Sequence, residues 1–331
     1  MAERVLVTGG GGFLGAAICR QLVARGDQVR SLARGDYPAL RALGVETIRG
    51  DAADPEAAER AVAGCDLVIH AAAKAGVWGD EAAYHRANVL ATQAILGACR
   101  RQGVGRLVFT SSPSVVAGGA PLRGADESTP YPARYLAPYP HTKAIAERAV
   151  RAAHGATLRT VSLRPHLILG PGDPHLVPRL IERARKGRLR LLGDGRNLVD
   201  VTYVEDAARA HLLAADALRD PGSPAGGRVY FLSQGQPMAL AELLARILNE
   251  AGLPRPQRTI PPAVGYALGA VAEGLYRALP LPGEPPLTRF VAEELATDHY
   301  FDISAARRDL GYTPSVSVEE LTRIVGSSTT P

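Results

Sequence analysis

A short apolar run that ends in a cluster of glycines constrains the fold of this chain more than any other feature. Residues 5–7 read Val-Leu-Val, and Gly9, Gly12 and Gly15 follow at intervals of three. A strand, a turn and a helix start of this kind present backbone N–H groups to an anion. The first glycine permits the sharp turn, the second lets the backbone approach a pyrophosphate, and the third lets the helix pack on the strand. The pattern therefore predicts a dinucleotide site rather than a flexible glycine-rich loop.

Strand and helix patterns alternate through the first half of the chain. Further apolar runs that predict β-strands occupy 28–33, 47–50, 67–70, 107–110, 158–164 and 230–233, and the first four are separated by helical patterns. This alternation is typical of a parallel, doubly wound sheet, so we predict an α/β fold of the Rossmann type. The NAD(P)-binding domain would comprise 1–165 and 200–234. A smaller, discontinuous C-terminal substrate region would comprise 166–199 and 235–325, before a frayed tail at 326–331.

Two apolar helical patterns, at 263–279 and 288–295, belong to the predicted substrate region. They could wall a lipid pocket, or they could bury their apolar faces against the sheet or a second subunit. The first could also lie on a membrane or meet a partner protein, although it is too short to span a bilayer.

Composition and charge exclude several classes of function. The 331 residues carry a net charge of +5, but the basic residues are scattered without interleaved aromatic residues, so no nucleic-acid partner is predicted. The three cysteines lack the spacing of a metal site or a disulfide framework, which favours buried thiols in a reducing compartment and no metal site. Because the first strand begins near residue 4, there is no room for a signal peptide, and we expect a cytoplasmic protein.

The end of the second strand bears on the choice of cofactor. An NAD-binding protein usually carries an acidic residue there, which binds the ribose hydroxyls. Here the strand runs into Arg34, and Asp36 lies further along the turn. A guanidinium can pair with a 2′-phosphate, so we predict NADP(H) in preference to NAD(H). The alternative is that Arg34 is an ordinary surface arginine and that Asp36 binds the ribose.

Hydroxyl groups and a lysine supply candidate catalytic residues. Ser112 follows the fifth strand, and Tyr139 and Lys143 are four residues apart, which places them on one face of a helix. Reduction of a ketone needs a hydride source, a proton donor and a group that polarises the carbonyl. Tyr139 can donate the proton and Ser112 can polarise the carbonyl. A nearby Lys143 ammonium is expected to lower the pKa of the Tyr139 phenol and to bind the nicotinamide ribose.

In residues 8–15, 110–112 and 139–143 the chain resembles the extended branch of the short-chain dehydrogenase/reductase superfamily, and the resemblance covers nearly its full length. It implies NAD(P)-dependent oxidoreduction with Ser112, Tyr139 and Lys143 as the catalytic triad, and we expect a homodimer. The expected cofactor contacts are Gly9, Gly12, Phe13, Leu14, Gly15, Arg34, Asp51, Ala52, Ala71, Ala72, Lys143 and Pro165.

Other stretches are similar to narrower groups. Residues 137–143 and 197–206 resemble the 3β-hydroxysteroid and sterol dehydrogenases. Residues 34–38, 72–79, 113–115 and 281–286 resemble the bacterial 2-alkyl-3-oxoalkanoate reductases of long-chain olefin biosynthesis. The latter resemblance implies NADPH-dependent reduction of the 3-keto group of a lipophilic β-keto acid before β-lactone formation, with possible association with other pathway enzymes. The expected substrate pocket comprises Lys74, Trp78, Pro113, Ser114 and His166.

Three other functions remain open at this point. A 3β-hydroxysteroid or sterol dehydrogenase would use the same residues in the oxidative direction. A nucleotide-sugar epimerase is disfavoured, because Val199 stands near the place where that group carries a phosphate-binding arginine. A non-catalytic dinucleotide-binding scaffold is also possible on this fold, but such proteins tend to lose the tyrosine or the lysine, and this chain keeps both.

Overall fold

A computed structural model describes residues 2–174, 176–279 and 281–328. Its centre is a seven-stranded sheet in which every neighbouring pair is parallel. The strand order is β12 (Val229–Leu232), β7 (Arg159–Pro165), β5 (Arg106–Thr110), β4 (Leu67–His70), β1 (Arg4–Thr8), β2 (Gln28–Ala33) and β3 (Glu46–Arg49). The predicted doubly wound α/β fold is confirmed.

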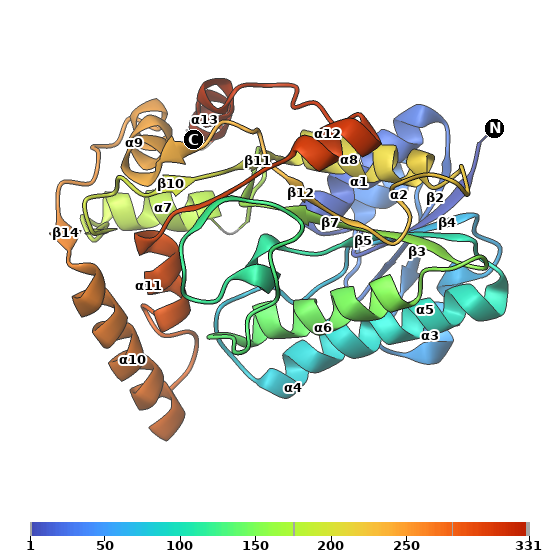
Figure 1. Cartoon of the computed structure of the whole chain (residues 1–331), viewed down its shortest axis with the longest axis horizontal. Helices are drawn as coiled ribbons and strands as arrows, with labels where there is room; N and C mark the ends of the chain where they lie inside the picture. The colour runs from blue at the N-terminus through green and yellow to red at the C-terminus, as the bar shows by residue number, and fades with distance from the viewer. Residues whose placement is uncertain (1, 175, 280, 329–331) are drawn as a thin grey trace.

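Helices cover both faces of this sheet (Figure 1). One face carries α1 (Phe13–Arg25), α8 (Val204–Ala217) and α12 (Ser304–Leu310). The other carries α3 (Pro55–Val62), α5 (Ala91–Gln102) and α6 (Pro138–Ala152), and the short α2 (Pro38–Ala42) follows β2. The central strands are apolar on both sides because each side is buried beneath helices. The predicted helix over 81–101 is instead α4 (Glu81–Tyr84), a π-helical segment (His85–Leu90) and α5.

The remaining elements form a second, smaller layer beside the carboxyl ends of the strands. A four-stranded sheet has the order β13 (Met238–Ala239), β10 (Leu198–Val199), β15 (His299–Phe301) and β6 (Leu122–Ala125). Two strand pairs join β8 (Ile168–Leu169) to β11 (Thr202–Tyr203) and β9 (Leu191–Leu192) to β14 (Thr259–Ile260). The helices are α7 (Leu176–Arg185), α9 (Leu240–Glu250), α10 (Pro262–Ala278), α11 (Arg289–Ala296) and α13 (Val318–Ser327).

Two details of the chain path differ from what the sequence predicts. The segment 118–138 is not only a loop, because β6 within it pairs in parallel with β15 and so connects the two predicted regions. Helix α13 begins after its N-cap Ser317 and continues through Ser327, past the start of the predicted frayed tail, where Gly326 packs closely on α9. Residues 329–331 of that tail lie outside the described residues.

Candidate active site

The glycine turn between β1 and α1 has the geometry that a bound pyrophosphate requires. Gly9 has φ of +71°, and the Gly12 N–H donates to the Gly9 carbonyl at 2.9 Å. A Cβ on Gly15 would lie 2.1 Å from the Gly9 carbonyl oxygen, so only glycine fits there. Helix α1 begins at Phe13 with no side-chain cap and no acidic residue in its first turn. Its first N–H groups, including those of Phe13 and Leu14, therefore remain available to an anion.

The residues beside this turn lie at the ends of neighbouring strands. The Ala72 N–H donates to Thr8 Oγ1 at 3.1 Å, and a Cβ on Gly9 would lie 2.9 Å from the Ala72 Cα. Ala71 and Ala72 thus bring the end of β4 directly against the turn. Pro165 ends β7, which lies two strands from β4 on the side away from β1. Beyond β3, the half-buried Asp51 accepts a hydrogen bond from Arg86 Nε at 3.0 Å, and Ala52 is buried beside it. The structure places these predicted cofactor residues along one edge of the sheet.

Arg34 and Asp36 have different surroundings at the end of β2. The Asp36 carboxylate forms an ion pair with Arg41, and this hydrogen bond holds the pKa of Asp36 below its usual range. Arg34 is exposed, and its side chain has no ion-pair partner among the residues that the structure describes. The acid that would bind a ribose is therefore already engaged, whereas the guanidinium is not.

Ser112, Tyr139 and Lys143 come together at the carboxyl end of β5. Ser112 lies just after the strand, and its side chain is within hydrogen-bonding reach of the Tyr139 phenol. Helix α6 starts at Pro138, one residue before Tyr139, so Tyr139 and Lys143 share a face as expected. The Lys143 ammonium donates to the Thr110 carbonyl at 2.5 Å and lies 4.1 Å from the centre of the Phe109 ring. A hydroxyl, a phenol and an amine thus converge at the carboxyl end of β5, on the same edge of the sheet as the glycine turn.

The electrostatics of this group differ from the expectation in one respect. Burial raises the pKa of the Tyr139 phenol, and the Ser112 hydrogen bond only partly opposes that rise. No lowering by Lys143 is found, because the ammonium points to the end of β5. Burial in turn lowers the pKa of Lys143 to about 7, although the charge of Glu147 opposes the shift. Tyr139 is thus a protonated donor at neutral pH, and Lys143 is poised to exchange a proton there.

Buried residues that the sequence analysis did not assign support this group. Asn88, in the π-helical segment, receives the Lys74 N–H at 2.8 Å and donates to Thr142 Oγ1 at 2.9 Å, so it ties the loop after β4 to α6. Glu147, one turn beyond Lys143, forms a two-point ion pair with Arg164 of β7, with Nε–Oε2 at 2.9 Å and Nη2–Oε1 at 2.5 Å. The continuation of the 139–143 spacing to Glu147 was the signal that could have revealed it.

The predicted substrate-pocket residues divide into two groups. The Ser114 hydroxyl lies 2.8 Å from the Ser112 hydroxyl, and Pro113 is buried between them in the chain. The Lys74 ammonium lies 5.0 Å from the centre of the Tyr84 ring, and Trp78 makes an edge contact with Tyr276 of α10 at 6.3 Å. These four residues surround the carboxyl ends of β4 and β5.

His166 has a different environment. Its imidazole is buried, with Nε2 2.7 Å from His299 Nδ1, and its ring packs edge-on against Phe301. Burial, with a contribution from His299, moves its pKa well below the usual value. The His166 side chain thus connects the main sheet to β15 rather than lying open to a substrate.

A buried histidine behind the site leads to a test of pH dependence. His211 Nε2 and the Thr110 hydroxyl oxygen share a hydrogen bond at 2.8 Å, and burial lowers the pKa of His211 to about 4. The neutral ring therefore contributes stability that is complete above the unfolded pKa of about 6.5 and is lost as the pH falls toward 4. We expect the stability advantage of the wild type over His211→Asn to shrink by about 1.4 kcal/mol per pH unit in that window.

Urea unfolding of the wild type and His211→Asn between pH 7 and pH 4 measures the difference between their free energies of unfolding. Titrating groups that the two proteins share cancel in that difference. His141→Asn, at an exposed ring, controls for the substitution itself. A pH-independent difference between the wild type and His211→Asn would show that His211 does not titrate in this way.

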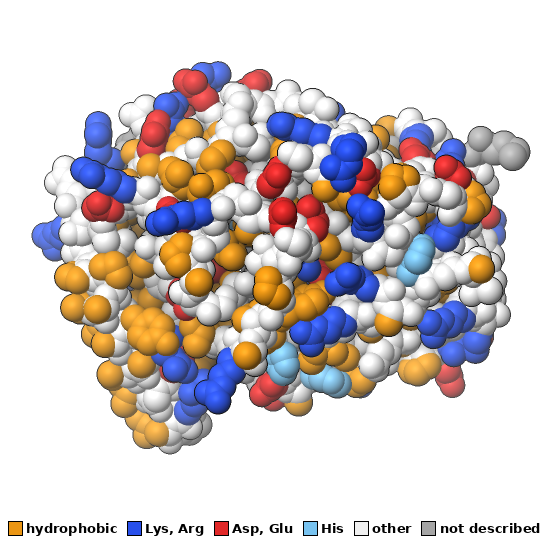
Figure 2. Space-filling model, viewed as in Figure 1, with side chains coloured by type: hydrophobic (Ala, Val, Ile, Leu, Met, Phe, Trp, Pro, Cys, Tyr) orange, Lys and Arg blue, Asp and Glu red, His pale blue; other side chains and the backbone are white. Residues whose placement is uncertain are grey.

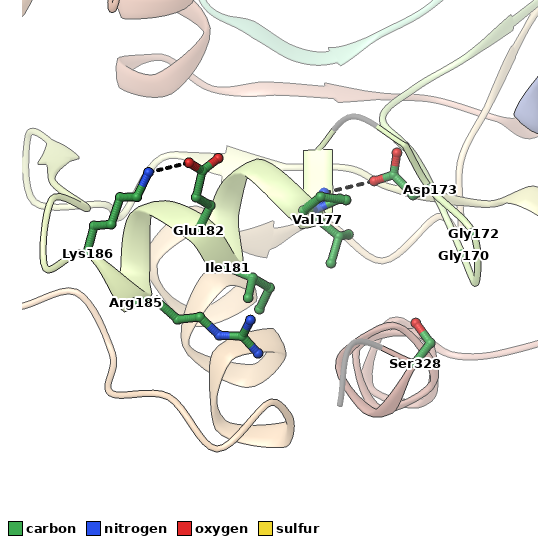
Figure 3. Close-up of a pocket in the computed structure, with 10 residues that line it drawn as sticks. Gly170, Gly172, Asp173, Val177, Ile181, Glu182, Arg185, Lys186 and Ser328 are labelled. Carbon is green, nitrogen blue, oxygen red and sulfur yellow. Dashed lines mark hydrogen bonds and ion pairs between the residues drawn. The ribbon is translucent and has the colours of Figure 1, made fainter. Parts of the chain in front are cut away.

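A cavity of about 490 Å³ lies apart from these residues (Figure 3). Its lining comes from the segment 170–186 and from Ser328, and it includes none of the predicted site residues. Asp173 accepts from the Val177 N–H at 2.8 Å and Lys186 pairs with Glu182, so these three polar side chains of the lining make contacts within α7 and its ends. Among residues 2–174, 176–279 and 281–328, no cluster of His, Cys, Asp or Glu could hold a metal ion. The three cysteines in these ranges are free and buried, as expected.

A parallel sheet with a dinucleotide turn and a Ser–Tyr–Lys group at one edge defines the class of NAD(P)-dependent oxidoreductases. Residues 6–262 match the 3-beta hydroxysteroid dehydrogenase/isomerase family, and the chain belongs to it.

Individual relatives extend over the whole chain. A 2-alkyl-3-oxoalkanoate reductase of Stenotrophomonas maltophilia is 54% identical and covers 98% of this chain and 99% of its own. A protein of the same name from Shewanella oneidensis is 47% identical, over 96% of this chain and 84% of its own. Among solved structures, MoeE5 in complex with UDP-glucose and NAD is 29% identical, with a TM-score of 0.74 over 98% of both chains.

Proposed function

We propose that this protein reduces the 3-keto group of a 2-alkyl-3-oxoalkanoic acid to the 3-hydroxy acid with NADPH, in the pathway to long-chain olefins through a β-lactone. The observation that carries the substrate assignment is the 54% identity, over 98% of the chain, to a protein named for that reaction. The grouping of Ser112, Tyr139 and Lys143 supports the chemistry, because it offers a proton donor and a carbonyl-polarising hydroxyl side by side.

Each side chain has a role that follows from its environment. A reduced nicotinamide, when bound, supplies the hydride for C3 of the substrate. The Tyr139 phenol donates its proton to the ketone oxygen, and its raised pKa keeps that proton in place at neutral pH. The Ser112 hydroxyl donates a hydrogen bond to the same oxygen and orients it. The Lys143 ammonium, held at the end of β5 by the Thr110 carbonyl, binds the nicotinamide ribose, and the Tyr139 phenolate regains its proton from solvent.

The preference for NADPH rests on the end of β2. Arg34 is exposed beside the expected adenosine site, whereas the Asp36 carboxylate is engaged by Arg41. A guanidinium binds a 2′-phosphate through charge-assisted hydrogen bonds. The glycine turn, which lacks a competing carboxylate, binds the pyrophosphate.

Turnover of a synthetic 2-alkyl-3-hydroxyalkanoate tests the proposal. The oxidative direction avoids the ready decarboxylation of β-keto acids. We expect purified protein to reduce NADP⁺ faster than NAD⁺ with this substrate and to leave 3β-hydroxysteroids unchanged. Turnover of the steroid alone would be consistent with the proposed catalytic roles and would contradict the assignment to the olefin pathway. Tight cofactor binding without any turnover would favour the non-catalytic scaffold.

The cofactor preference is tested in the same assay. Loss of one charge-assisted hydrogen bond is worth about 10- to 100-fold, so Arg34→Ala should reduce the NADP⁺-over-NAD⁺ preference by that factor. Arg60→Ala, at an exposed arginine of α3, is the matched control. An unchanged preference in Arg34→Ala would assign the 2′-phosphate contact elsewhere.

We further propose that the protein acts as a homodimer in the cytoplasm and associates with other enzymes of the pathway. Sedimentation of the purified chain measures the oligomeric state directly. Val199, in β10, is buried and paired with β13 and β15, so it offers no charge to the phosphates of a nucleotide sugar and disfavours that alternative substrate.

A further inference from the structure

Helix α10 is attached to the protein by its small residues. Gly265 faces Leu192 of β9, and a Cβ on Gly269 would lie 2.8 Å from the Arg289 backbone nitrogen, so the helix backbone touches the start of α11. Glu273 is buried on the same side and accepts from Arg289 Nη2 at 2.7 Å. Close backbone contact and an ion pair, rather than burial of leucines, therefore hold α10 in place.

The large apolar side chains of α10 point outward as a result. Val264, Leu268, Val271 and Leu275 recur at intervals of four, three and four residues, and Leu279 follows directly after the helix as its C-cap. All five are 47–61% exposed. We call these five residues the α10 stripe. Figure 1 shows α10 at the margin of the molecule, and Figure 2 shows hydrophobic side chains gathered over it. A contiguous apolar patch of this kind on a folded surface marks an interaction site.

The elements beside the α10 stripe are strongly basic. Residues 176–192, which form α7 and lead through β9, contain six Arg or Lys and one Glu, a net charge of +5 that equals the charge of the whole chain. Arg190 and Arg258 immediately precede the paired strands β9 and β14, so two like charges lie side by side just before α10. Arg188, Arg255 and Arg258 have no carboxylate partner among the described residues. This arrangement favours an anionic partner.

Contacts link this corner to both α7 and the candidate active site. Arg179 of α7 pairs with Glu284, in the loop that follows α10, at 3.4 Å. The Arg277 guanidinium at the end of α10 lies 5.3 Å from the centre of the Trp78 ring, in the loop that follows β4. A surface that covers the α10 stripe would therefore adjoin the loop beside the catalytic group.

We propose that the α10 stripe and the adjoining arginines dock the protein on an anionic phospholipid surface, with α10 lying in the interface. Apolar residues on one helix face, flanked by basic residues, are typical of helices that lie in this way. No described helix is long and apolar enough to cross a bilayer. A second copy of the chain fits this surface less well, because a two-fold contact through α10 would bring the two basic clusters together.

Vesicle sedimentation with the purified full-length protein tests the proposal. Vesicles of phosphatidylcholine alone are compared with vesicles that also contain phosphatidylglycerol, at low and high salt. We expect binding to the anionic vesicles that weakens as salt rises. The double variant Leu268→Ser with Leu275→Ser should lower partitioning of the protein onto the vesicles by about tenfold or more. The double variant Arg255→Gln with Arg258→Gln should lower it by about fivefold for each arginine.

The matched control replaces Leu43 and Leu90 with serine, since these leucines are 40% and 38% exposed but lie outside the α10 stripe. It should bind vesicles as the wild type does. Thermal unfolding of each variant checks that the fold is retained. Failure of the wild type to bind anionic vesicles, or equal binding by the stripe variants, overturns the proposal. Loss of a dimer in the stripe variants, without vesicle binding by the wild type, assigns the surface to a second copy.

Discussion

Replacing Tyr139 with phenylalanine is expected to lower kcat/KM by about 10²- to 10⁴-fold, the usual contribution of a general acid. The substitution removes one oxygen from a half-buried ring at the second residue of α6. Backbone and packing are unchanged, so stability and cofactor affinity should stay close to those of the wild type. Initial rates with the 3-hydroxy acid and NADP⁺, beside calorimetric titration of the cofactor, measure the two effects separately.

Tyr135→Phe is the matched control for this prediction. The Tyr135 hydroxyl donates to the Val115 carbonyl at 2.9 Å, and its ring stacks on His141, so it lies near the site without joining the catalytic group. Its removal should change kcat/KM by no more than a few-fold. Comparable activity of Tyr139→Phe and Tyr135→Phe would show that Tyr139 is not the proton donor.

Breaking the buried ion pair between Glu147 and Arg164 is expected to cost about 3–5 kcal/mol of stability. The side chains of Glu147 and Arg164 are 0% and 2% exposed, and Tyr131 adds a hydrogen bond to the Glu147 carboxylate at 2.5 Å. Burial alone would raise the pKa of Glu147, but the Arg164 hydrogen bond and charge hold it below its usual range. Glu147→Gln leaves a buried guanidinium without a counter-charge, and urea unfolding measures the cost.

A double-mutant cycle separates the interaction energy of Glu147 with Arg164 from the contacts that each side chain makes with other residues. Adding Arg164→Met to Glu147→Gln removes the unpaired charge, so the double variant should be more stable than Glu147→Gln alone. Arg60→Ala breaks the exposed pair of Arg60 and Glu56, at 3.9 Å, and should cost less than about 1 kcal/mol. If Glu147→Gln costs no more than Arg60→Ala, the buried pair is not a major source of stability.

The same pair connects stability to the candidate site. Glu147 lies one turn beyond Lys143 on α6, and Arg164 immediately precedes Pro165 at the end of β7. The Glu147 charge also opposes the fall in the pKa of Lys143. In Glu147→Gln the pKa of Lys143 should therefore fall further below its usual value. The pH profile of kcat/KM in that variant would report the change independently of its stability.

Features that depend on neighbouring residues were predictable from the sequence. The glycine spacing at 9, 12 and 15, the strand–helix alternation and the four-residue interval between Tyr139 and Lys143 are all written in short segments. Each has a direct geometric meaning: a tight turn, a parallel crossover and a shared helix face. The dinucleotide turn, the sheet and the convergence of Ser112 with Tyr139 in the structure agree with that interpretation.

Features that depend on distant residues were decided by the tertiary structure. His166 pairs with His299, 133 positions away, and β6 pairs with β15 across the two predicted regions. The direction in which the Tyr139 pKa moves depends on burial, and the position of the Lys143 ammonium depends on the carbonyl of Thr110. The outward stripe of α10 follows from Gly269 meeting the start of α11 and Gly265 meeting Leu192 of β9. Periodicity shows which residues share a helix face, but whether that face is buried depends on which other elements pack against it.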